Sequence, residues 1–180
     1  MHLFNKKIFP STELILGMSL ILLLLGCATK DDSSIQLVEA SIIDLQTALL
    51  NGDASCREIV EGYIARIEIY DQSRGINAIT DINPNALGRA DTIDKALAAN
   101  EPMPELFCAP LLIKDNFDTA DMVTTGGSIA LRDSVPPDDA FMIRKLREAG
   151  AIVLAKTNMA EWAFSPAQSI SSSYGRTTNA

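Results

Sequence analysis

Two short apolar runs in this chain end in the same way, and this repeated ending constrains the fold more than any other feature. The first run leads into Lys114, Asp115 and Asn116, and the second leads into Lys156 and, two residues later, Asn158. Short apolar runs that stop at polar residues are typical of buried strands. The sequence therefore predicts two buried strands, each of which delivers a lysine to its end.

Lys114 is a candidate general base. An ammonium group at the end of a buried strand loses part of its hydration, and desolvation favours the neutral amine that can accept a proton. The ordinary alternative is a surface charge on a strand that ends in solvent. Lys156 has the equivalent position after the second run, so the residues alone leave two candidates for the base.

Composition excludes several kinds of chemistry. The chain has 180 residues, 47% of them hydrophobic, and a formal net charge of −8. Its basic residues are scattered, so we expect no nucleic-acid partner. The single histidine, His2, lies in a segment that we expect to be removed. The mature chain is then left without a Ser-His-Asp or Cys-His arrangement and without an imidazole-bound zinc, and we expect no metal or cofactor.

Residues 1–26 have the three parts of an export signal. Lys6 and Lys7 precede an apolar run at residues 14–25, and the small residue Gly26 follows it. As a helix this run rises about 18 Å, which is shorter than the hydrocarbon core of roughly 30 Å. It therefore predicts a targeting segment rather than a permanent membrane span.

The Leu-Leu-Gly-Cys sequence that ends at Cys27 resembles the lipobox of bacterial lipoproteins, in which the cysteine is lipidated and becomes the new N-terminus. The resemblance implies a lipid anchor at Cys27 and a location in the cell envelope. Ala28, rather than aspartate, follows the cysteine, which implies the outer membrane if the cell is Gram-negative. Residues 27–40 are then expected to form a polar tether and residues 41–180 the folded domain.

Periodicity and capping signals predict the scaffold around the two strands. The expected elements are a helix at 42–50, a helix opened by the capping-box pair Ser55 and Glu58, a strand at 76–82, a helix at 84–99, a helix opened by Asp138, and a short helix opened by Asn158. Cys56 and Cys108 fit either a disulfide or two buried thiols, and the sequence leaves their state open.

Five motifs in order resemble the N-terminal part of the amidase signature family. They are Pro110-Leu-Leu-Ile-Lys-Asp-Asn116, Thr124-Thr-Gly-Gly-Ser128, Leu146-Arg-x-Ala-Gly-Ala151, Lys156-Thr-Asn-Met-x-Glu161 and Tyr174-Gly-x-Thr-x-Asn179. The resemblance implies an α/β fold with a mixed central sheet flanked by helices. It also implies that this fold is incomplete in the present chain.

The resemblance also implies a reaction. The family hydrolyses carbon-nitrogen amide bonds with a serine, a second serine in a cis peptide and a lysine, and its lysine corresponds to Lys114. Asp115, Asn116 and Lys156 take supporting positions. Both serines of the family follow the last of the five motifs, beyond Ala180. We therefore expect this chain to carry the base without the nucleophile and to be inactive alone.

Two alternatives accompany this expectation of a lipid-anchored amidase. The A subunit of a tRNA-dependent amidotransferase, which amidates glutamate or aspartate charged on tRNA, belongs to the same family, but its chemistry belongs in the cytoplasm and the export signal argues against it. The other alternative is a shortened, non-catalytic lipoprotein. The expected partners of the amidase are a small-molecule amide substrate and the membrane that holds the anchor.

Overall fold

The structure is a computed structural model that describes residues 35–72, 75–165 and 167–179. The predicted export signal, Cys27 and the first part of the predicted tether lie outside these residues. Within the described part of the chain, no helix is both long enough and apolar enough to cross a bilayer.

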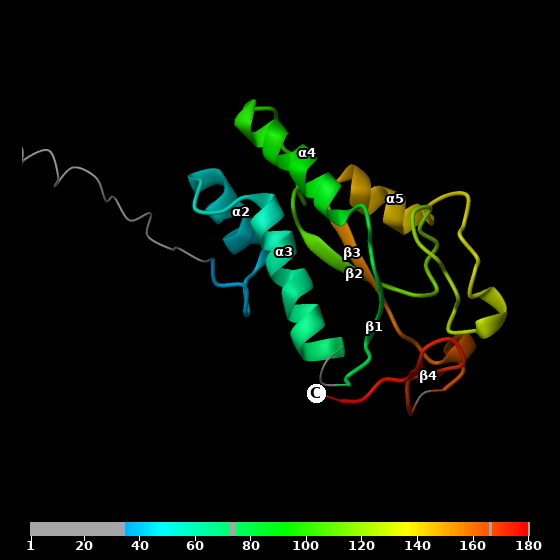
Figure 1. Cartoon of the computed structure of the whole chain (residues 1–180). Coiled ribbons are helices and arrows are strands. Elements are labelled where there is room, and N and C mark those ends of the chain that lie inside the picture. The colour runs from blue at the N-terminus through cyan, green and yellow to red at the C-terminus, as the bar shows by residue number, and fades with distance from the viewer. Residues whose placement is uncertain (1–34, 73–74, 166, 180) are drawn as a thin grey trace, which may run out of the picture. The chain divides into compact units, whose positions relative to one another are not determined.

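Helices and short strands alternate along the chain (Figure 1). In order, the elements are α2 (Ile42–Asn51), α3 (Cys56–Arg66), the π-helix η1 (Ile67–Gln72), β1 (Ile79–Ile82), α4 (Ala86–Ala98), β2 (Pro110–Lys114), the 3-10 helix η2 (Ile129–Leu131), α5 (Phe141–Glu148), β3 (Ile152–Thr157), the 3-10 helix η3 (Glu161–Ala163), β4 (Ile170–Ser171) and β5 (Gly175–Arg176). The central strand β3 pairs antiparallel with β1 and parallel with β2. The expected α/β fold with a mixed sheet is thus confirmed.

The helix cap predicted for α3 is present, whereas the cap predicted for α5 is not. Ser55 and Glu58 form the predicted capping box at the start of α3. Asp138 does not open α5, which begins after Ala140. The neighbouring Asp139 faces the helix instead, with a carboxylate oxygen 3.0 Å from Nε of Arg147. The start of α5 is therefore held by an ion pair between Asp139 and Arg147 in the last turn of the helix, and among the described residues no side chain caps its first turn.

The register between β2 and β3 includes one irregularity. Leu111 pairs with Val153 and Leu112 pairs with Ala155, which leaves Leu154 as an extra residue in β3. A bulge of this kind reverses the alternation of side chains for the rest of the strand. The residues of β3 after the bulge therefore face the side opposite to the one that strict alternation predicts.

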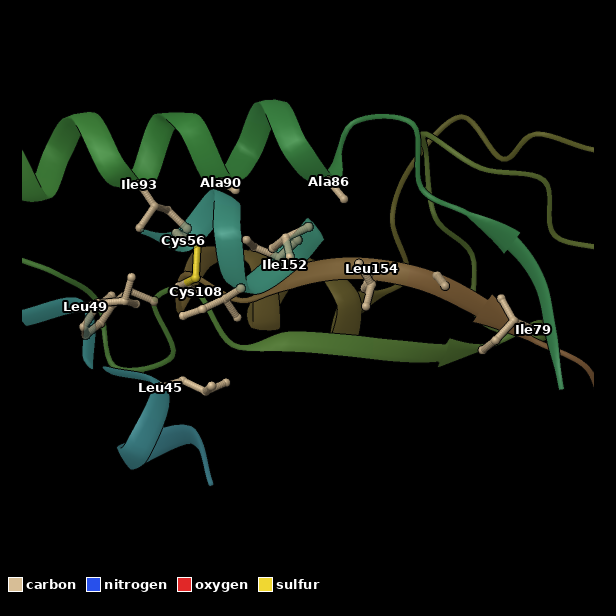
Figure 2. Packing of buried hydrophobic residues seen from close by; sticks show 14 residues of the cluster. Leu45, Leu49, Cys56, Ile79, Ala86, Ala90, Ile93, Cys108, Ile152 and Leu154 are labelled. Atoms are coloured by element: carbon tan, nitrogen blue, oxygen red, sulfur yellow. A yellow bond between two sulfur atoms is a disulfide. The ribbon is translucent and has the colours of Figure 1, made fainter. Parts of the chain in front are cut away.

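Two hydrophobic clusters cover the two faces of the sheet. The larger lies against α2, α3 and α4 (Figure 2), and its members include Leu45, Leu49, Ala86, Ala90, Ile93, Ile152 and Leu154. The smaller lies against α5 and contains Ile113, Met122, Ile143 and Val153. Full burial of a Leu, Ile or Val side chain contributes about 1.5–3 kcal/mol. We call the two sides of the sheet the α3 face and the α5 face.

Packing begins earlier in the chain than the predicted boundary at residue 41. Ile35, Leu37 and Ala40 are partly buried against the larger cluster. The Tyr63 hydroxyl donates a hydrogen bond to the Leu37 carbonyl at 3.1 Å. The last residues of the expected tether therefore contact the domain.

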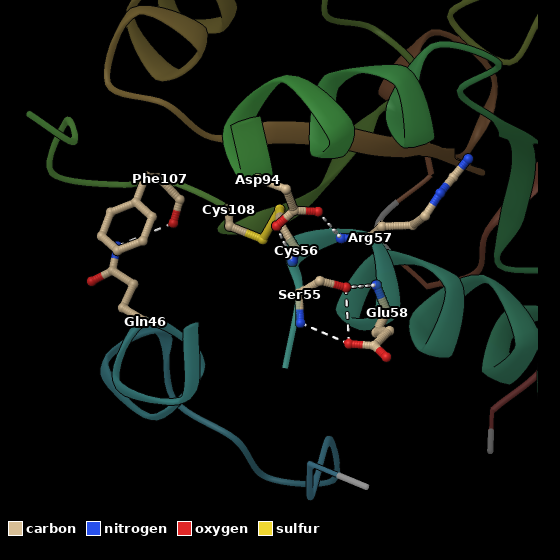
Figure 3. Close-up of a disulfide and its surroundings, with 8 residues drawn as sticks. All are labelled: Gln46, Ser55, Cys56, Arg57, Glu58, Asp94, Phe107 and Cys108. Carbon is tan, nitrogen blue, oxygen red and sulfur yellow. Dashed lines mark hydrogen bonds between the residues drawn. A yellow bond between two sulfur atoms is a disulfide. The ribbon is translucent and has the colours of Figure 1, made fainter. Parts of the chain in front are cut away.

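Cys56 and Cys108 form a disulfide, which settles the question that the sequence left open (Figure 3). Both residues are buried, and their Cα atoms are 5.8 Å apart. Asp94 on α4 accepts hydrogen bonds from the backbone N–H groups of Cys56 and Arg57. The covalent bond ties the start of α3 to the segment that leads into β2.

Candidate active site

Lys114 is the last residue of β2, and its side chain is exposed. Because side chains alternate along a strand, Lys114 lies on the same face as Leu112, which is 52% exposed, whereas Ile113 between them is buried. The prediction that Lys114 is desolvated at the end of a buried strand is wrong in the part of the chain that the structure describes, because its side chain is exposed. The physical reason is that only the α5 face is covered at this end of β2.

Two hollows flank the exposed end of β2. The one beside Lys114 has a volume of about 330 Å³, and Thr157, Asn158 and Ser169 contribute to its lining. The other has a volume of about 480 Å³ and is lined mainly by apolar side chains, among them Ile42, Tyr63, Ile67, Tyr70, Pro110 and Leu154. Leu112 lines both hollows. The amine of Lys114 is thus accessible from a polar hollow that adjoins an apolar one.

Lys156 is fully buried, in contrast to Lys114. It pairs in register with Ile113 and lies on the α5 face, as the bulge in β3 requires. Its Nζ donates hydrogen bonds to the Phe117 carbonyl at 2.8 Å and to Thr124 Oγ1 at 2.9 Å. Burial lowers the pKa of Lys156, and the nearby carboxylate of Asp115 acts in the opposite direction.

Asp115 forms an ion pair with the Lys156 ammonium, since its Oδ1 lies 3.6 Å from Nζ. The Lys156 ammonium therefore has two hydrogen-bond acceptors and one carboxylate counter-charge around it. The Asp115 side chain is also fully buried and accepts hydrogen bonds from the N–H of Thr125, the hydroxyl of Thr125 and the N–H of Gly127. Asp115 and Lys156 thus belong to one buried polar network.

The loop around Gly126 and Gly127 is part of this network. The N–H of Gly126 donates to the Asp115 carbonyl at 3.0 Å. Gly127 has a φ of +79°, and a Cβ at this position would lie 3.0 Å from the backbone Cα of Glu161. Only glycine combines this backbone conformation with this close approach. The two glycines therefore serve the packing of the loop against the segment that follows β3.

Asn158 connects the end of β3 to the C-terminal hairpin, in which β4 pairs antiparallel with β5. Its side-chain amide donates to the carbonyl of Gly175 at 3.2 Å and to the hydroxyl of Thr177 at 3.0 Å. Its Oδ1 accepts a hydrogen bond from the Ser171 hydroxyl at 2.9 Å. The prediction that Asn158 opens a short helix is therefore wrong, because its side chain bonds to β4 and β5 rather than to the next turn.

The predicted site residues thus divide into two groups. Asp115 and Lys156 form a buried ion pair on the α5 face of the sheet, whereas Lys114 and Asn116 are exposed at the end of β2. Among residues 35–72, 75–165 and 167–179, no group of three or more His, Cys, Asp or Glu side chains is placed to hold a metal ion.

Comparison with known proteins supports the resemblance that the motifs around these residues suggested. The family profile described as amidase matches residues 58–180. This chain belongs to the amidase signature family. The five motifs that suggested the resemblance all lie inside the matched range.

The amidase signature chain is similar to proteins from several organisms. It is 37% identical over 140 residues to the A subunit of glutamyl-tRNA(Gln) amidotransferase from Prochlorococcus marinus, covering 77% of this chain and 28% of that protein. The solved peptide amidase of Stenotrophomonas maltophilia is 36% identical with a TM-score of 0.74, over 81% of this chain and 31% of that one. An amidase family protein of Bacillus anthracis is 32% identical with the same TM-score of 0.74, over 90% and 34%. The chain therefore spans about a third or less of the length of these relatives.

Proposed function

We propose that this protein is a serine amidohydrolase in which Lys114 is the general base. Membership of the amidase signature family supports hydrolysis of a carbon-nitrogen amide bond. The observation that carries the choice of base is the contrast between the two lysines. Lys114 is exposed beside a hollow, whereas Lys156 is fully buried, with two hydrogen-bond acceptors and the Asp115 carboxylate around its Nζ. An ammonium that is buried, donates two hydrogen bonds and pairs with a carboxylate is not exposed to a substrate.

In the proposed mechanism, the neutral amine of Lys114 accepts a proton from a bridging serine, which accepts one from the nucleophilic serine. The same relay returns a proton to the leaving amine. Both serines follow residue 180 in the family pattern. We infer that the part of an amidase that carries them packs over the exposed end of β2. Lys114 would then face the bridging serine across the hollow beside β2.

Amide hydrolysis by two polypeptides tests this function. A polypeptide that continues through the Gly/Ser-rich segment of the family should release ammonia from a simple primary amide, and Lys114→Ala should lower kcat by at least about 100-fold. Lys95→Ala, at an exposed position on α4, is the matched control and should leave kcat unchanged. Full activity in the Lys114→Ala variant would contradict the assignment of the base.

The 180-residue chain should release no ammonia by itself, because the nucleophile is expected beyond it. Turnover by the purified 180-residue chain that disappears in Lys114→Ala would contradict this part of the proposal. In that case the nucleophile would have to be sought among the serines of residues 1–180.

We also infer that the protein is exported and held by a lipid anchor at Cys27, in the outer membrane if the cell is Gram-negative. The buried Cys56–Cys108 disulfide supports export independently of the lipobox, because disulfides persist in oxidising compartments. Cys27→Ala should abolish incorporation of labelled fatty acid and leave the precursor uncleaved. Continued labelling of that variant would end the claim of a lipid anchor.

Two alternatives accompany this proposal, and the comparisons support the first of them. The similarity to an amidotransferase of the A-subunit type supports action on glutamate or aspartate charged on tRNA, but the disulfide and the export signal both favour the amidase. A shortened, non-catalytic lipoprotein is the second alternative. The nucleotide sequence after codon 180 separates it from the amidase. An open frame that encodes the Gly/Ser-rich segment favours the enzyme, and a stop codon favours the non-catalytic lipoprotein.

A further inference from the structure

We propose that Asp115 and Lys156 are positioning residues, a buried ion pair that fixes the backbone turn presenting Lys114 to the substrate. This inference rests on the proposed role of Lys114 as the base and adds how the chain holds that base in place. Both charges are fully buried on the α5 face, whereas Lys114 lies on the opposite face of β2. Neither member of the pair reaches the hollow beside Lys114.

The first argument comes from the turn that ends β2. The N–H of Phe117 donates to the Lys114 carbonyl at 3.0 Å, which closes a turn over residues 114–117. The carbonyl of Phe117 accepts a hydrogen bond from Lys156 Nζ at 2.8 Å. The N–H of Asp115 donates to the Thr157 carbonyl at 3.1 Å. The turn that carries Lys114 is therefore attached to β3 at two points, one of which is the Lys156 ammonium.

The second argument comes from the loop over residues 124–127. The Asp115 carboxylate accepts hydrogen bonds from Thr125 and Gly127, and the Lys156 ammonium donates to Thr124. Each charge thus has hydrogen-bond partners in addition to the other charge. Such bonds are what a buried ion pair needs if its desolvation is to be compensated. The ion pair therefore joins the turn over residues 114–117 to the loop over residues 124–127, on the face of β2 opposite to the Lys114 side chain.

Trp162 is a natural reporter of this unit, because it is the only tryptophan in the sequence. Its backbone N–H donates to the Gly126 carbonyl at 2.9 Å. Its ring lies against Gly126, at 3.5 Å from the point where a Cβ would stand. A change in the loop over residues 124–127 should therefore alter the fluorescence of Trp162.

The test uses the full 180-residue chain and three variants. Lys156→Met removes one charge and keeps an unbranched side chain that is one atom shorter. Asp115→Asn/Lys156→Met removes both charges, and it keeps the test possible if the single variant does not fold. Lys145→Met is the matched control, since Lys145 forms an ion pair with Glu148 at 2.6 Å on the exposed side of α5.

Amide hydrogen exchange, followed by NMR, is the main measurement. If the pair positions the turn, exchange at Phe117, Gly126 and Gly127 should be faster by roughly tenfold or more in both Lys156 variants. Exchange at Ala90 and Ile93 in α4 should change much less in the double variant. The emission of Trp162 should shift in the two Lys156 variants and stay unchanged in Lys145→Met.

Equal acceleration at all amides of the double variant would overturn the proposal, because it would indicate a general loss of stability rather than a local one. The proposal would also be overturned if Phe117 and Gly127 exchanged in the double variant at the rates of the wild type. These measurements need no turnover. Amide hydrolysis that does not depend on Lys114 would therefore end the proposed function without affecting the exchange result, and uniform exchange would end only the positioning role.

Discussion

The ends of β2 and β3 look alike in sequence and differ in the folded chain. Each strand has a lysine at or next to its last residue and an asparagine two residues after that lysine, and the strands lie side by side in parallel. Lys114 is nevertheless exposed, whereas Lys156 is fully buried. The bulge at Leu154 accounts for the difference, because it turns Lys156 toward the α5 face while Lys114 faces the other way.

This difference separates two uses of a lysine. A proton acceptor needs access to the substrate, and only Lys114 lies beside a hollow. A structural cation needs acceptors on all sides, and Lys156 has Phe117, Thr124 and Asp115 around its Nζ. The register of a strand, rather than the local motif, decides which use each lysine has.

The largest effect is expected from removing the buried charge. Lys156→Met should lower the free energy of unfolding by about 3–5 kcal/mol, because it leaves the Asp115 carboxylate buried without its cation. Lys114→Met should change it by less than about 0.5 kcal/mol, as is usual for exposed positions. Urea denaturation measures both values. Equal losses in the two variants would remove the contrast between the strand ends.

The disulfide should have the next largest effect. Cys56→Ala/Cys108→Ala should lower the free energy of unfolding by about 2–4 kcal/mol, since the bond closes a loop with a sequence separation of 52. The disulfide lies before the start of β2, so this variant tests whether the entry to β2 depends on a covalent bond while the β3 end depends on an ion pair. The measurement is urea denaturation with and without a reductant. A reductant should destabilise the wild type and leave the double variant unchanged, and the reverse pattern would count against the bond.

Gly127 tests the contact between the loop and the segment after β3. Gly127→Ala should cost about 1–3 kcal/mol, because it places a side chain at a φ of +79°. Gly52→Ala is a matched control, since Gly52 has a φ of +75° and a Cβ there would meet nothing within 4 Å. Thermal denaturation should show a larger loss for Gly127→Ala. Equal losses would mean that the close approach to Glu161 has no cost of its own.

The smallest effect concerns pH. Burial and a hydrogen bond from its hydroxyl to Asp81 raise the pKa of Tyr174 above its ordinary value. Its contribution to stability is therefore fully present below about pH 10, the ordinary pKa of tyrosine, and is lost as the pH rises above it. Asp81 pairs with Lys156 in register, so this contact lies next to the β3 end. In denaturation curves from pH 8 upward, Tyr174→Phe should weaken the alkaline loss of stability, and an unchanged slope would exclude Tyr174 as its source.

Sequence patterns predicted the elements whose signals are local. The capping box at Ser55 and Glu58 and the apolar run before Lys114 both depend on residues close together in the chain, and the structure has both elements. The exposure of Lys114 could not be predicted, because it depends on which face of β2 the rest of the chain covers. The bulge at Leu154 was equally hidden, since it arises from pairing with a distant strand.

The polar contacts of the site show the same limit. The sequence singled out Asp115 and Lys156 as supporting residues, but their contact depends on the bulge that turns Lys156 toward the α5 face. Asn158 was expected to open a helix, and its bonds to the C-terminal hairpin join residues up to 19 positions apart. Long-range contacts of this kind leave no periodic signal in a single sequence.

Competitive acetylation of the folded 180-residue chain tests the central contrast most directly. A limiting amount of an amine-reactive acetylating reagent, followed by mass spectrometry of peptides, gives the relative reactivity of each lysine. Lys114 should react at a rate similar to that of the exposed Lys95, and Lys156 should react at least about 100-fold more slowly, because its amine reacts only when the site opens. Reaction of Lys156 as fast as Lys114 in the folded chain would contradict the account.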